Sequence, residues 1–290
     1  MNETLLKKVK RIEIATKRMM DDIMTGGYKS HFKGQGVQFS EHRQYMPGDD
    51  IRHLDWKVSA RSREPLVKLY EEERELNVFI IADLSASLDF GSLKNTKREV
   101  LAELAAMIAY AASNTGDKVG VLLVTDRVEK IIELKKGRNH VLRIIRDLLT
   151  HPTRPGGTAL RKALEETRRL MKHSGIVFVL SDFKAEGLEI PVRQLSRKHD
   201  VVAVKIEDEA EFSIKTSGRF PILDPESGRV FELDTRSNIE NESLDFSNAA
   251  FAQKTKTLFK QAGVETLSIQ TREDHAERLL QFLKRRKQKR

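Results

Sequence analysis

The 290-residue chain contains no cysteine. This excludes disulfides, thiolate zinc sites and cysteine nucleophiles, and it fits a reducing compartment. No apolar run approaches the roughly 18 to 20 residues that a membrane helix needs. Residues 1–24 mix charged and apolar side chains and lack the apolar core of a signal peptide. We therefore expect a cytoplasmic protein with no integral membrane segment.

Aromatic residues are also scarce, at 6% of the chain, and they do not alternate with basic residues as they do on base-stacking surfaces. Basic residues nevertheless exceed acidic ones, which gives a formal net charge of +9, and several stand in the C-terminal run LKRRKQKR (283–290). Such a run suits the solvated end of a helix, where Lys and Arg complement the helix dipole. We favour that interpretation and keep nucleic-acid binding through the tail as an alternative.

Several catalytic and nucleotide-binding motifs are missing. The sequence has no P-loop and no G-x-S-x-G element, and GQGVQF (34–39) lacks the third glycine of a dinucleotide-binding fingerprint. A phosphatase of the haloacid type would need a second carboxylate two residues after Asp83, where Ser85 stands. These families are therefore not indicated.

What is present is an alternation of short apolar runs with helical patterns from residue 76 onward. The expected strands are 77–83, 118–126, 128–134, 175–182, 200–208 and 264–271, and the expected helices are 97–116, 139–150, 158–173, 190–198, 248–263 and 273–288. This rhythm predicts an α/β fold, a doubly wound and mainly parallel sheet covered on both faces. Residues 210–236 break the rhythm, and residues 221–234 among them predict a hairpin insertion with its turn at 226–228.

Residues 1–75 differ from the rest and predict a small N-terminal α+β extension, so that the domain boundaries are 1–75 and 76–290. A helix is expected over 3–24, and short strands are expected near 37–39 and 66–70. The segment 37–75 holds the only Trp, Trp56, together with His42, His53 and several aspartates. A metal site there is conceivable, but no tight zinc-type spacing occurs. We favour aspartates that shape turns, with Arg43, Arg52 and Arg61 paired to acids.

Polar residues gather where three segments are expected to meet at the carboxyl ends of the strands. The strand 77–83 runs into Asp83, Ser85 and Ser87, the segment RPGGTAL presents Thr158, and the strand 175–182 ends in Asp182. In an open α/β sheet such loops build the ligand site. Two carboxylates and three hydroxyls form an oxygen-only set, which suits hard cations such as Mg²⁺ and leaves a coordination position for an outside ligand. The alternative is structural: Ser85 and Ser87 cap the next helix, and both aspartates make hydrogen bonds. Thr158 is also expected to cap the helix 158–173.

The arrangement resembles the metal-ion-dependent adhesion site (MIDAS) of von Willebrand factor A domains. The pattern there is Asp-x-Ser-x-Ser, a Thr in a second loop and an Asp after a later strand, and Asp83, Ser85, Ser87, Thr158 and Asp182 match all five positions. The stretch from Gly36 through the DLSAS motif (83–87) is further similar to the bacterial domain-of-unknown-function family 58. That resemblance implies a von Willebrand factor A-like fold, a divalent cation (Mg²⁺, or Mn²⁺ or Ca²⁺) at these five residues, and a MoxR-type AAA+ ATPase as partner.

The sequence thus favours a non-enzymatic, metal-dependent protein-interaction module, an adaptor for an AAA+ ATPase in protein assembly or remodelling. The partner would offer an Asp or Glu as the final metal ligand. The enzymatic alternative is a Mg²⁺-dependent phosphoester hydrolase, for which Asp89 or His140 would have to serve as the base.

Overall fold

The computed structural model describes residues 38–71, 75–92, 95–152, 156–211, 218–223, 230–234 and 251–289. The chain divides into two compact units, one formed by Lys29–Leu76 and the other including Asn77–Arg290. The predicted helix over 3–24 lies outside the described residues. No helix within the described ranges is long and apolar enough to cross a membrane.

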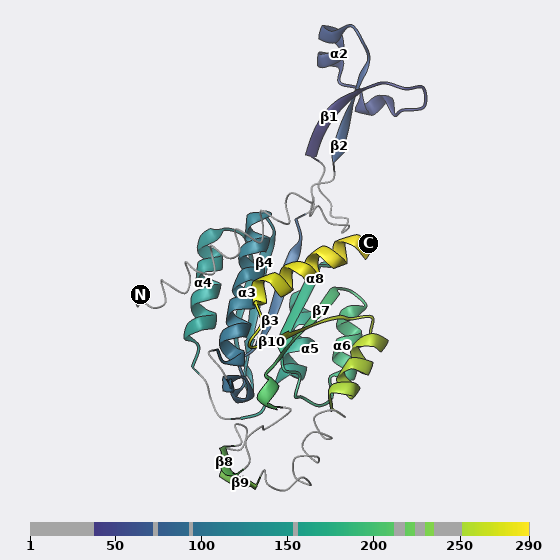
Figure 1. Ribbon diagram of the computed structural model, residues 1–290. Helices are drawn as coiled ribbons and strands as arrows, with labels where there is room; N and C mark the ends of the chain where they lie inside the picture. The colour runs from purple at the N-terminus through teal and green to yellow at the C-terminus, as the bar shows by residue number, and fades with distance from the viewer. Residues whose placement is uncertain are drawn as a thin grey trace. The chain divides into compact units, whose positions relative to one another are not determined.

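The larger unit is built on a six-stranded sheet in the order β10-β7-β6-β3-β4-β5 (Figure 1). Its strands are β3 (Asn77–Asp83), β4 (Lys118–Val124), β5 (Val128–Lys135), β6 (Ile176–Ser181), β7 (Asp200–Glu207) and β10 (Glu265–Gln270). All neighbours are parallel except β4 and β5, which form an antiparallel pair. The prediction of a mainly parallel α/β sheet is therefore confirmed.

The order of the strands creates a switch point at β3. The chain leaves β3 for β4 and β5 on one side, then returns to β6, β7 and β10 on the other. Loops that follow β3 and β6 consequently diverge from one place at the carboxyl edge of the sheet, which is where open α/β sheets bind ligands.

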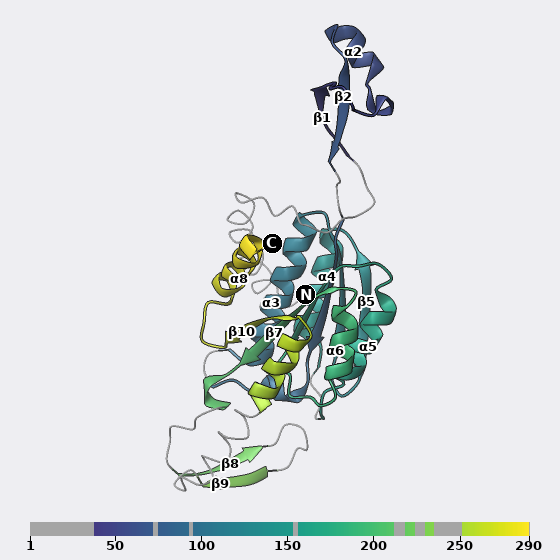
Figure 2. The same cartoon turned by 90° about the vertical axis from the view of Figure 1, so that its right-hand side faces the viewer.

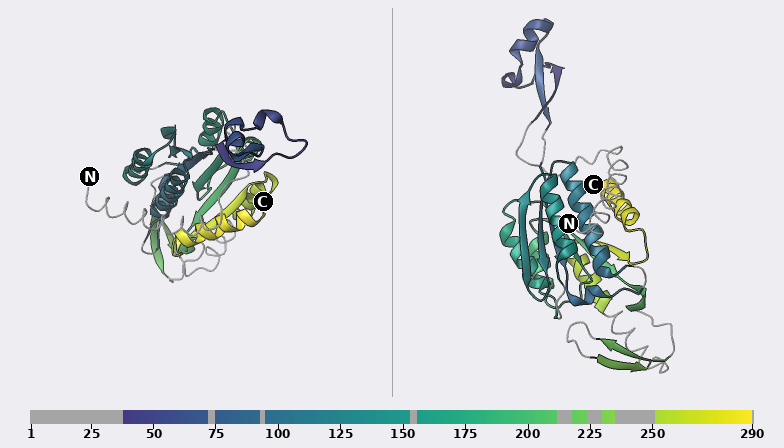
Figure 3. Two further views of the ribbon diagram at one scale, coloured as in Figure 1. Left: turned by 90° about the horizontal axis from the view of Figure 1, so that it is seen from above. Right: turned by 90° about the vertical axis from the view of Figure 1, so that its left-hand side faces the viewer.

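Helices cover both faces of this sheet, as Figures 2 and 3 show. On one side lie α3 (Lys97–Asn114), α4 (Arg138–Thr150) and α8 (His275–Lys289), and on the other lie α5 (Leu160–Leu170), α6 (Glu189–Ser196) and the helical residues 251–261. The alternation of side chains along a strand assigns Phe79 and Ile81 to the core beneath α5 and α6. Both faces of β3 are buried, which explains why the strand is an uninterrupted apolar run.

Most expected elements are present, with one difference that concerns the site. Thr158 was expected to cap the helix after it, but α5 begins after Ala159 and has no side-chain cap. The Thr158 hydroxyl instead donates a hydrogen bond to Asp83. The expected hairpin is present as β8 (Arg219–Leu223) paired with β9 (Val230–Asp234), while its predicted turn at 226–228 lies outside the described residues.

The smaller unit contains the antiparallel pair β1 (Gln38–Gln44) and β2 (Leu66–Glu71), as expected, and two short helices that were not. These are η1 (Ile51–His53) and α2 (Trp56–Ser62), which begin at the capping aspartates Asp50 and Asp55. Asp55 also contacts His42 at 3.1 Å. Trp56 is 69% exposed and contributes nothing to a core here.

The aspartates of this unit have structural roles. Asp49 accepts hydrogen bonds from the Met46 amide and from Arg43, both at 2.8 Å. Arg52 pairs with Asp50 at 2.9 Å. The favoured interpretation is therefore confirmed for two of its three arginines, and it is wrong for Arg61, which forms no ion pair within the described part of the chain.

Gly175, immediately before β6, provides a sharp test of the packing between β6 and β3. A Cβ atom at this position would lie 2.3 Å from the backbone oxygen of Asn77, and a backbone atom in a sheet cannot move aside as a side chain does. We expect Gly175→Ala to lower the free energy of unfolding by about 3 kcal/mol in urea titrations. In the control Gly157→Ala the added methyl meets no atom within 4 Å, and the change should stay within about 0.5 kcal/mol. Equal stability of the two variants would contradict this account.

His199, between α6 and β7, predicts sensitivity to acid. Its side chain is buried, and neither ring nitrogen has a hydrogen-bond partner among the described residues. Burial, and secondarily the charge of Lys198, lowers the pKa of His199 from 6.5 to about 4. Between these pH values the unfolded chain binds a proton at His199 and the folded chain does not. The free energy of unfolding should therefore fall as the pH drops from about 6.5 to about 4. His199→Leu should reduce this loss in urea titrations at pH 7 and pH 5, and an identical loss in both proteins would contradict the prediction.

Candidate metal centre

The carboxyl ends of β3 and β6 lie side by side at the switch point. The two strands are parallel, with Ala82 opposite Leu180, so the residues that follow, Asp83 and Ser181, come next to each other. The Ser181 hydroxyl donates a hydrogen bond of 2.7 Å to Asp83. Asp182 follows directly, so that both predicted carboxylates emerge from adjacent strands.

Asp83 is the centre of the cluster and is fully buried. Its Oδ2 atom accepts hydrogen bonds from Ser181 at 2.7 Å and from Thr158 at 3.1 Å, and its Oδ1 atom accepts the Ser85 amide at 3.0 Å. Thr158 reaches it because the Ala159 amide is bonded to the carbonyl of Thr125 at the end of β4. Three loops therefore meet at one carboxylate.

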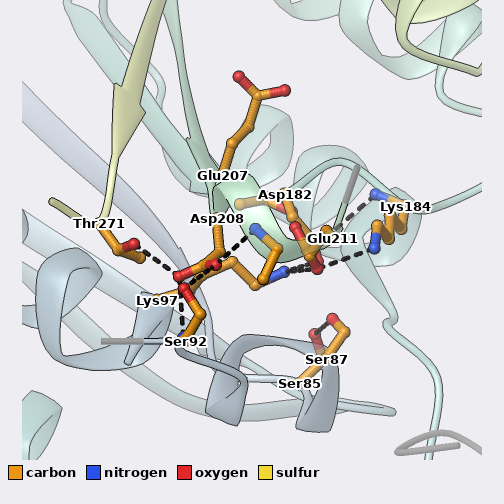
Figure 4. Close-up of polar contacts among 12 residues, drawn as sticks. Ser85, Ser87, Ser92, Lys97, Asp182, Lys184, Glu207, Asp208, Glu211 and Thr271 are labelled. Carbon is orange, nitrogen blue, oxygen red and sulfur yellow. Dashed lines mark hydrogen bonds and ion pairs between the residues drawn. The ribbon is translucent and has the colours of Figure 1, made fainter. Parts of the chain in front are cut away.

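Ser85 and Ser87 follow Asp83 along the chain, and their hydroxyl oxygens lie 3.3 Å apart. Figure 4 shows the two serine side chains together. Both are buried, on either side of the start of the short helix η2 (Ala86–Asp89). The Ser85 side chain makes no capping hydrogen bond, and Thr96 is the residue that caps α3. The capping alternative therefore does not explain Ser85.

Asp182 is buried and both of its oxygens are occupied. Oδ2 accepts a hydrogen bond of 2.9 Å from the ammonium of Lys97, and Oδ1 accepts the Lys184 amide at 3.2 Å. Lys97 also contacts Glu211 at 2.7 Å, and Glu211 in turn contacts the ammonium of Lys184 at 3.0 Å. Figure 4 shows these four side chains converging.

The two aspartates differ in their electrostatic surroundings. Burial, followed by the negative charge of Asp182, raises the pKa of Asp83 to about 6. Burial acts in the same direction on Asp182, but the charge and hydrogen bond of Lys97 outweigh it and lower the pKa of Asp182. Asp182 is thus neutralised within the protein, whereas Asp83 is a carboxylate with no cation of its own.

A strained turn holds Asp182 and Lys184. Phe183, between them, has a φ of 59°, a left-handed conformation that an aromatic residue adopts only at a cost of about 1 kcal/mol or more. Its amide bonds to the Ser181 hydroxyl at 2.8 Å, and its buried ring packs edge-on against Phe259 with ring centroids 4.9 Å apart. Packing from the core therefore fixes a turn whose polar neighbours belong to the site.

Lys97, Lys184 and Glu211 were not predicted to belong to the site, and Ser181 was placed at the end of its strand without a role in the site. A signal for Lys97 was present: a lysine at the first position of a helix opposes the helix dipole, so it calls for a compensating anion. Glu211 had no such signal, because its side chain is brought in from beyond β7, 114 residues away from Lys97 along the chain.

The two candidate bases of the hydrolase alternative occupy different places. Asp89 lies on the site loop, is exposed and faces Arg98 at 3.6 Å. His140 bonds to the carbonyl of Val119, at the start of β4. Because Val119 lies five residues before the end of that strand, His140 sits roughly 16 Å from the carboxyl edge. The expectation that His140 lies near the site is therefore wrong.

The basic tail has a partly structural role. Arg286 of α8 bonds to both carboxylate oxygens of Asp200 at 2.6 and 2.8 Å and pairs with Glu265. It thereby fastens α8 to the start of β7 and β10. Lys284 and Arg285 are exposed.

The donor set around Asp83 fits a hard cation. Asp83, Ser85, Ser87 and Thr158 offer oxygen only, which is the ligand chemistry of Mg²⁺ and Ca²⁺, and the buried carboxylate lacks a counter-charge. No group of three or more His, Asp or Glu side chains in the described ranges is arranged to hold a metal. That statement covers the His42 and His53 region as well. A cation at this cluster would rely on hydroxyls beside its carboxylates.

Comparison with known proteins gives the family. The family model described as "Protein of unknown function DUF58" matches residues 41–256. The chain belongs to this family.

Relatives of this DUF58 protein are themselves uncharacterised. "Uncharacterized protein Rv1480" of Mycobacterium tuberculosis (strain ATCC 25618 / H37Rv) is 29% identical over 288 residues, which cover 98% of this chain and 90% of the relative. "Uncharacterized protein YeaD" of Bacillus subtilis (strain 168) is 28% identical over 131 residues, 45% of this chain and 30% of YeaD. A solved structure, the conserved hypothetical protein BatB from Bacteroides thetaiotaomicron, is similar with a TM-score of 0.50 and 13% identity, covering 73% of this chain and 99% of BatB. This likeness supports the fold alone.

Proposed function

We propose that this DUF58 protein is a non-enzymatic interaction module with a von Willebrand factor A-like fold, which binds a divalent cation at the Asp83 cluster and uses it to hold a carboxylate of a partner protein. The observation that carries the proposal is the convergence on Asp83. One fully buried carboxylate receives hydrogen bonds from Thr158, Ser181 and the Ser85 amide, at the switch point of the sheet. Its raised pKa is the mark of a negative charge that the protein itself does not balance.

The residues of the cluster would have different roles as ligands. Asp83 would supply the charge that attracts the cation, while the hydroxyls of Ser85, Ser87 and Thr158 would supply neutral ligands, and Asp182 stands beside them. Bound Mg²⁺, Mn²⁺ or Ca²⁺ would provide an electrophilic centre that accepts one more oxygen ligand. Because so few of the ligands are charged, a carboxylate from outside would be attracted strongly.

The partner we propose is a MoxR-type AAA+ ATPase, which the family resemblance implies, with this protein as its adaptor in assembly or remodelling. Non-enzymatic binding is favoured because the cluster holds no imidazole and because Asp89, the nearest candidate base, faces Arg98.

The experiment has two parts. Isothermal titration of the full chain with Mg²⁺, Mn²⁺ and Ca²⁺ tests the cation site directly, and heats indistinguishable from buffer for all three would overturn the proposal. Capture of a MoxR-type ATPase on the immobilised chain is then compared in Mg²⁺, in chelator and after Mg²⁺ is restored. We expect capture to be lost and regained; capture unaffected by chelator would reject the metal bridge. Mg²⁺-dependent turnover in a phosphoester panel would reject the non-enzymatic assignment.

A further inference from the structure

Lys97 is an unusual residue to find at the edge of a proposed cation site. Its side chain is entirely buried, and its ammonium lies 2.9 Å from Asp182 and 2.7 Å from Glu211. Burying an ammonium is expensive unless its charge is balanced at short range. Two carboxylates at these distances achieve that balance, and they hold the pKa of Lys97 above its ordinary value against the opposing effect of burial.

The charges around the site can be paired one by one. The ammonium groups of Lys97 and Lys184 both contact Glu211, but of these two ammonium groups only that of Lys97 contacts the carboxylate of Asp182. Lys184 has a side chain 40% exposed, so water screens its charge. Asp83 is the remaining carboxylate, and its hydrogen bonds come from hydroxyls and an amide only.

From these contacts we infer that Lys97 is a tethered cation that occupies Asp182 and thereby sets a low affinity of the Asp83 cluster for divalent metal. In this arrangement only one of the two carboxylates is available to a cation. The inference rests on the proposed function, because it concerns the regulation of the same site. The inference also predicts which partner the site prefers. With Lys97 in place, a bound divalent ion leaves excess positive charge at the site, and this charge favours the binding of an acidic partner to the metal-loaded protein.

A divalent ion at the cluster would repel the Lys97 ammonium. Replacing Lys97 by an uncharged residue removes this repulsion and should therefore raise the affinity for the ion. At the separations of a few ångströms that a shared carboxylate imposes, removing one unit charge changes the interaction by more than the 1.4 kcal/mol that corresponds to tenfold in affinity. Lys97→Met alone would leave Glu211 with the partly exposed Lys184 as its partner and would add one net negative charge to a buried cluster. The test variant is therefore Lys97→Met combined with Glu211→Gln, which removes one positive and one negative charge together.

Isothermal titration with Mn²⁺ and with Mg²⁺ is the measurement, on metal-free full-length protein. We expect the K97M/E211Q protein to bind either ion about tenfold more tightly than the wild type, because the change releases the Asp182 carboxylate, which contacts Lys97 directly, as a second anionic ligand. Two controls accompany it: Lys97→Arg, which keeps the charge, and Lys184→Met, which removes the exposed ammonium that does not contact the Asp182 carboxylate. Both should stay within about threefold of the wild type. Circular dichroism and thermal melts establish that each variant is folded, and Lys97→Gln serves if the double variant is not.

Equal or weaker binding by folded K97M/E211Q, or by folded K97Q where that variant is used, would overturn the inference. The same titrations separate it from the proposed function. If the wild type shows no binding and the double variant binds, the inference stands and the proposed function fails for the wild-type protein. If the wild type binds and the double variant binds no better, the proposed metal site stands and the role of Lys97 is rejected. If neither folded protein binds, both are rejected.

Discussion

Replacing Asp83 with asparagine is expected to abolish divalent-cation binding without unfolding the protein. The substitution keeps the shape of the side chain but removes the one carboxylate of the cluster that has no internal cation. We expect the affinity for Mn²⁺ or Mg²⁺ to fall by about 100-fold or more, since changes that only support a metal ligand already cost 10- to 100-fold. Metal-dependent capture of the ATPase should be lost with it. Isothermal titration and capture are the measurements.

The stability of Asp83→Asn distinguishes this account from a structural one. The rise of the pKa of Asp83 from 3.8 to about 6 corresponds to roughly 3 kcal/mol against the ionised form at neutral pH. Removing that charge offsets the poorer hydrogen bonds of an amide, so the metal-free variant should unfold within about 1 kcal/mol of the wild type. Asp89→Asn is the matched control on the same loop: it should bind metal normally. A large loss of stability in D83N, with metal binding intact in the remaining folded protein, would show that Asp83 serves the fold alone.

Truncating Phe259 to alanine is expected to damage the site from a distance. Its ring packs against Phe183, and this contact holds the left-handed turn that carries Asp182 and Lys184. A buried Phe→Ala change costs about 3 to 5 kcal/mol. In addition, the relaxed turn should release Asp182 from its fixed position, and we expect metal affinity in the folded fraction to change by at least about threefold.

Phe282→Ala supplies the control for this second prediction. Phe282 is buried to a similar degree, but it lies on α8 and contacts Arg285 and Arg286 rather than the turn. Both variants should lose comparable stability in urea titrations, and only Phe259→Ala should alter the titration with Mn²⁺. Unchanged metal affinity in both would mean that the hydrogen bond from the Phe183 amide to the Ser181 hydroxyl is enough to hold the turn.

The hydrophobic pattern of the sequence predicted a helix or strand correctly where burial is uniform along that element. β3 is apolar throughout because both of its faces are covered, and α3 is rich in Ala and Leu because most of its surface is buried. Short helices in the smaller unit were missed for the opposite reason. The helix α2 has seven residues and buries none of them, so no apolar periodicity marked it.

Within the candidate site, too, some residues could be recognised from the sequence and others could not. Asp83, Ser85 and Ser87 follow one strand and could be recognised together, and Thr158 and Asp182 could be added because parallel strands end at one edge. The role of Thr158 was read incorrectly in part, since a threonine before a helix is more often a cap than a donor to another loop. Ser181 could be placed at the end of its strand but not given a role, because its hydrogen bond to Asp83 depends on the register between two strands that are far apart in the sequence.

The sequence by itself determined the class of fold, the oxygen-only chemistry at the strand ends and the absence of thiol chemistry, because each depends on residue types and on periodicities along a single segment. Only the tertiary structure decided which of the two aspartates is left without a counter-charge. That outcome depends on Lys97, which contacts Asp182, and on Glu211, which contacts Lys97. Both come from distant parts of the chain, and Coulomb interactions in a buried site are set by separation in space.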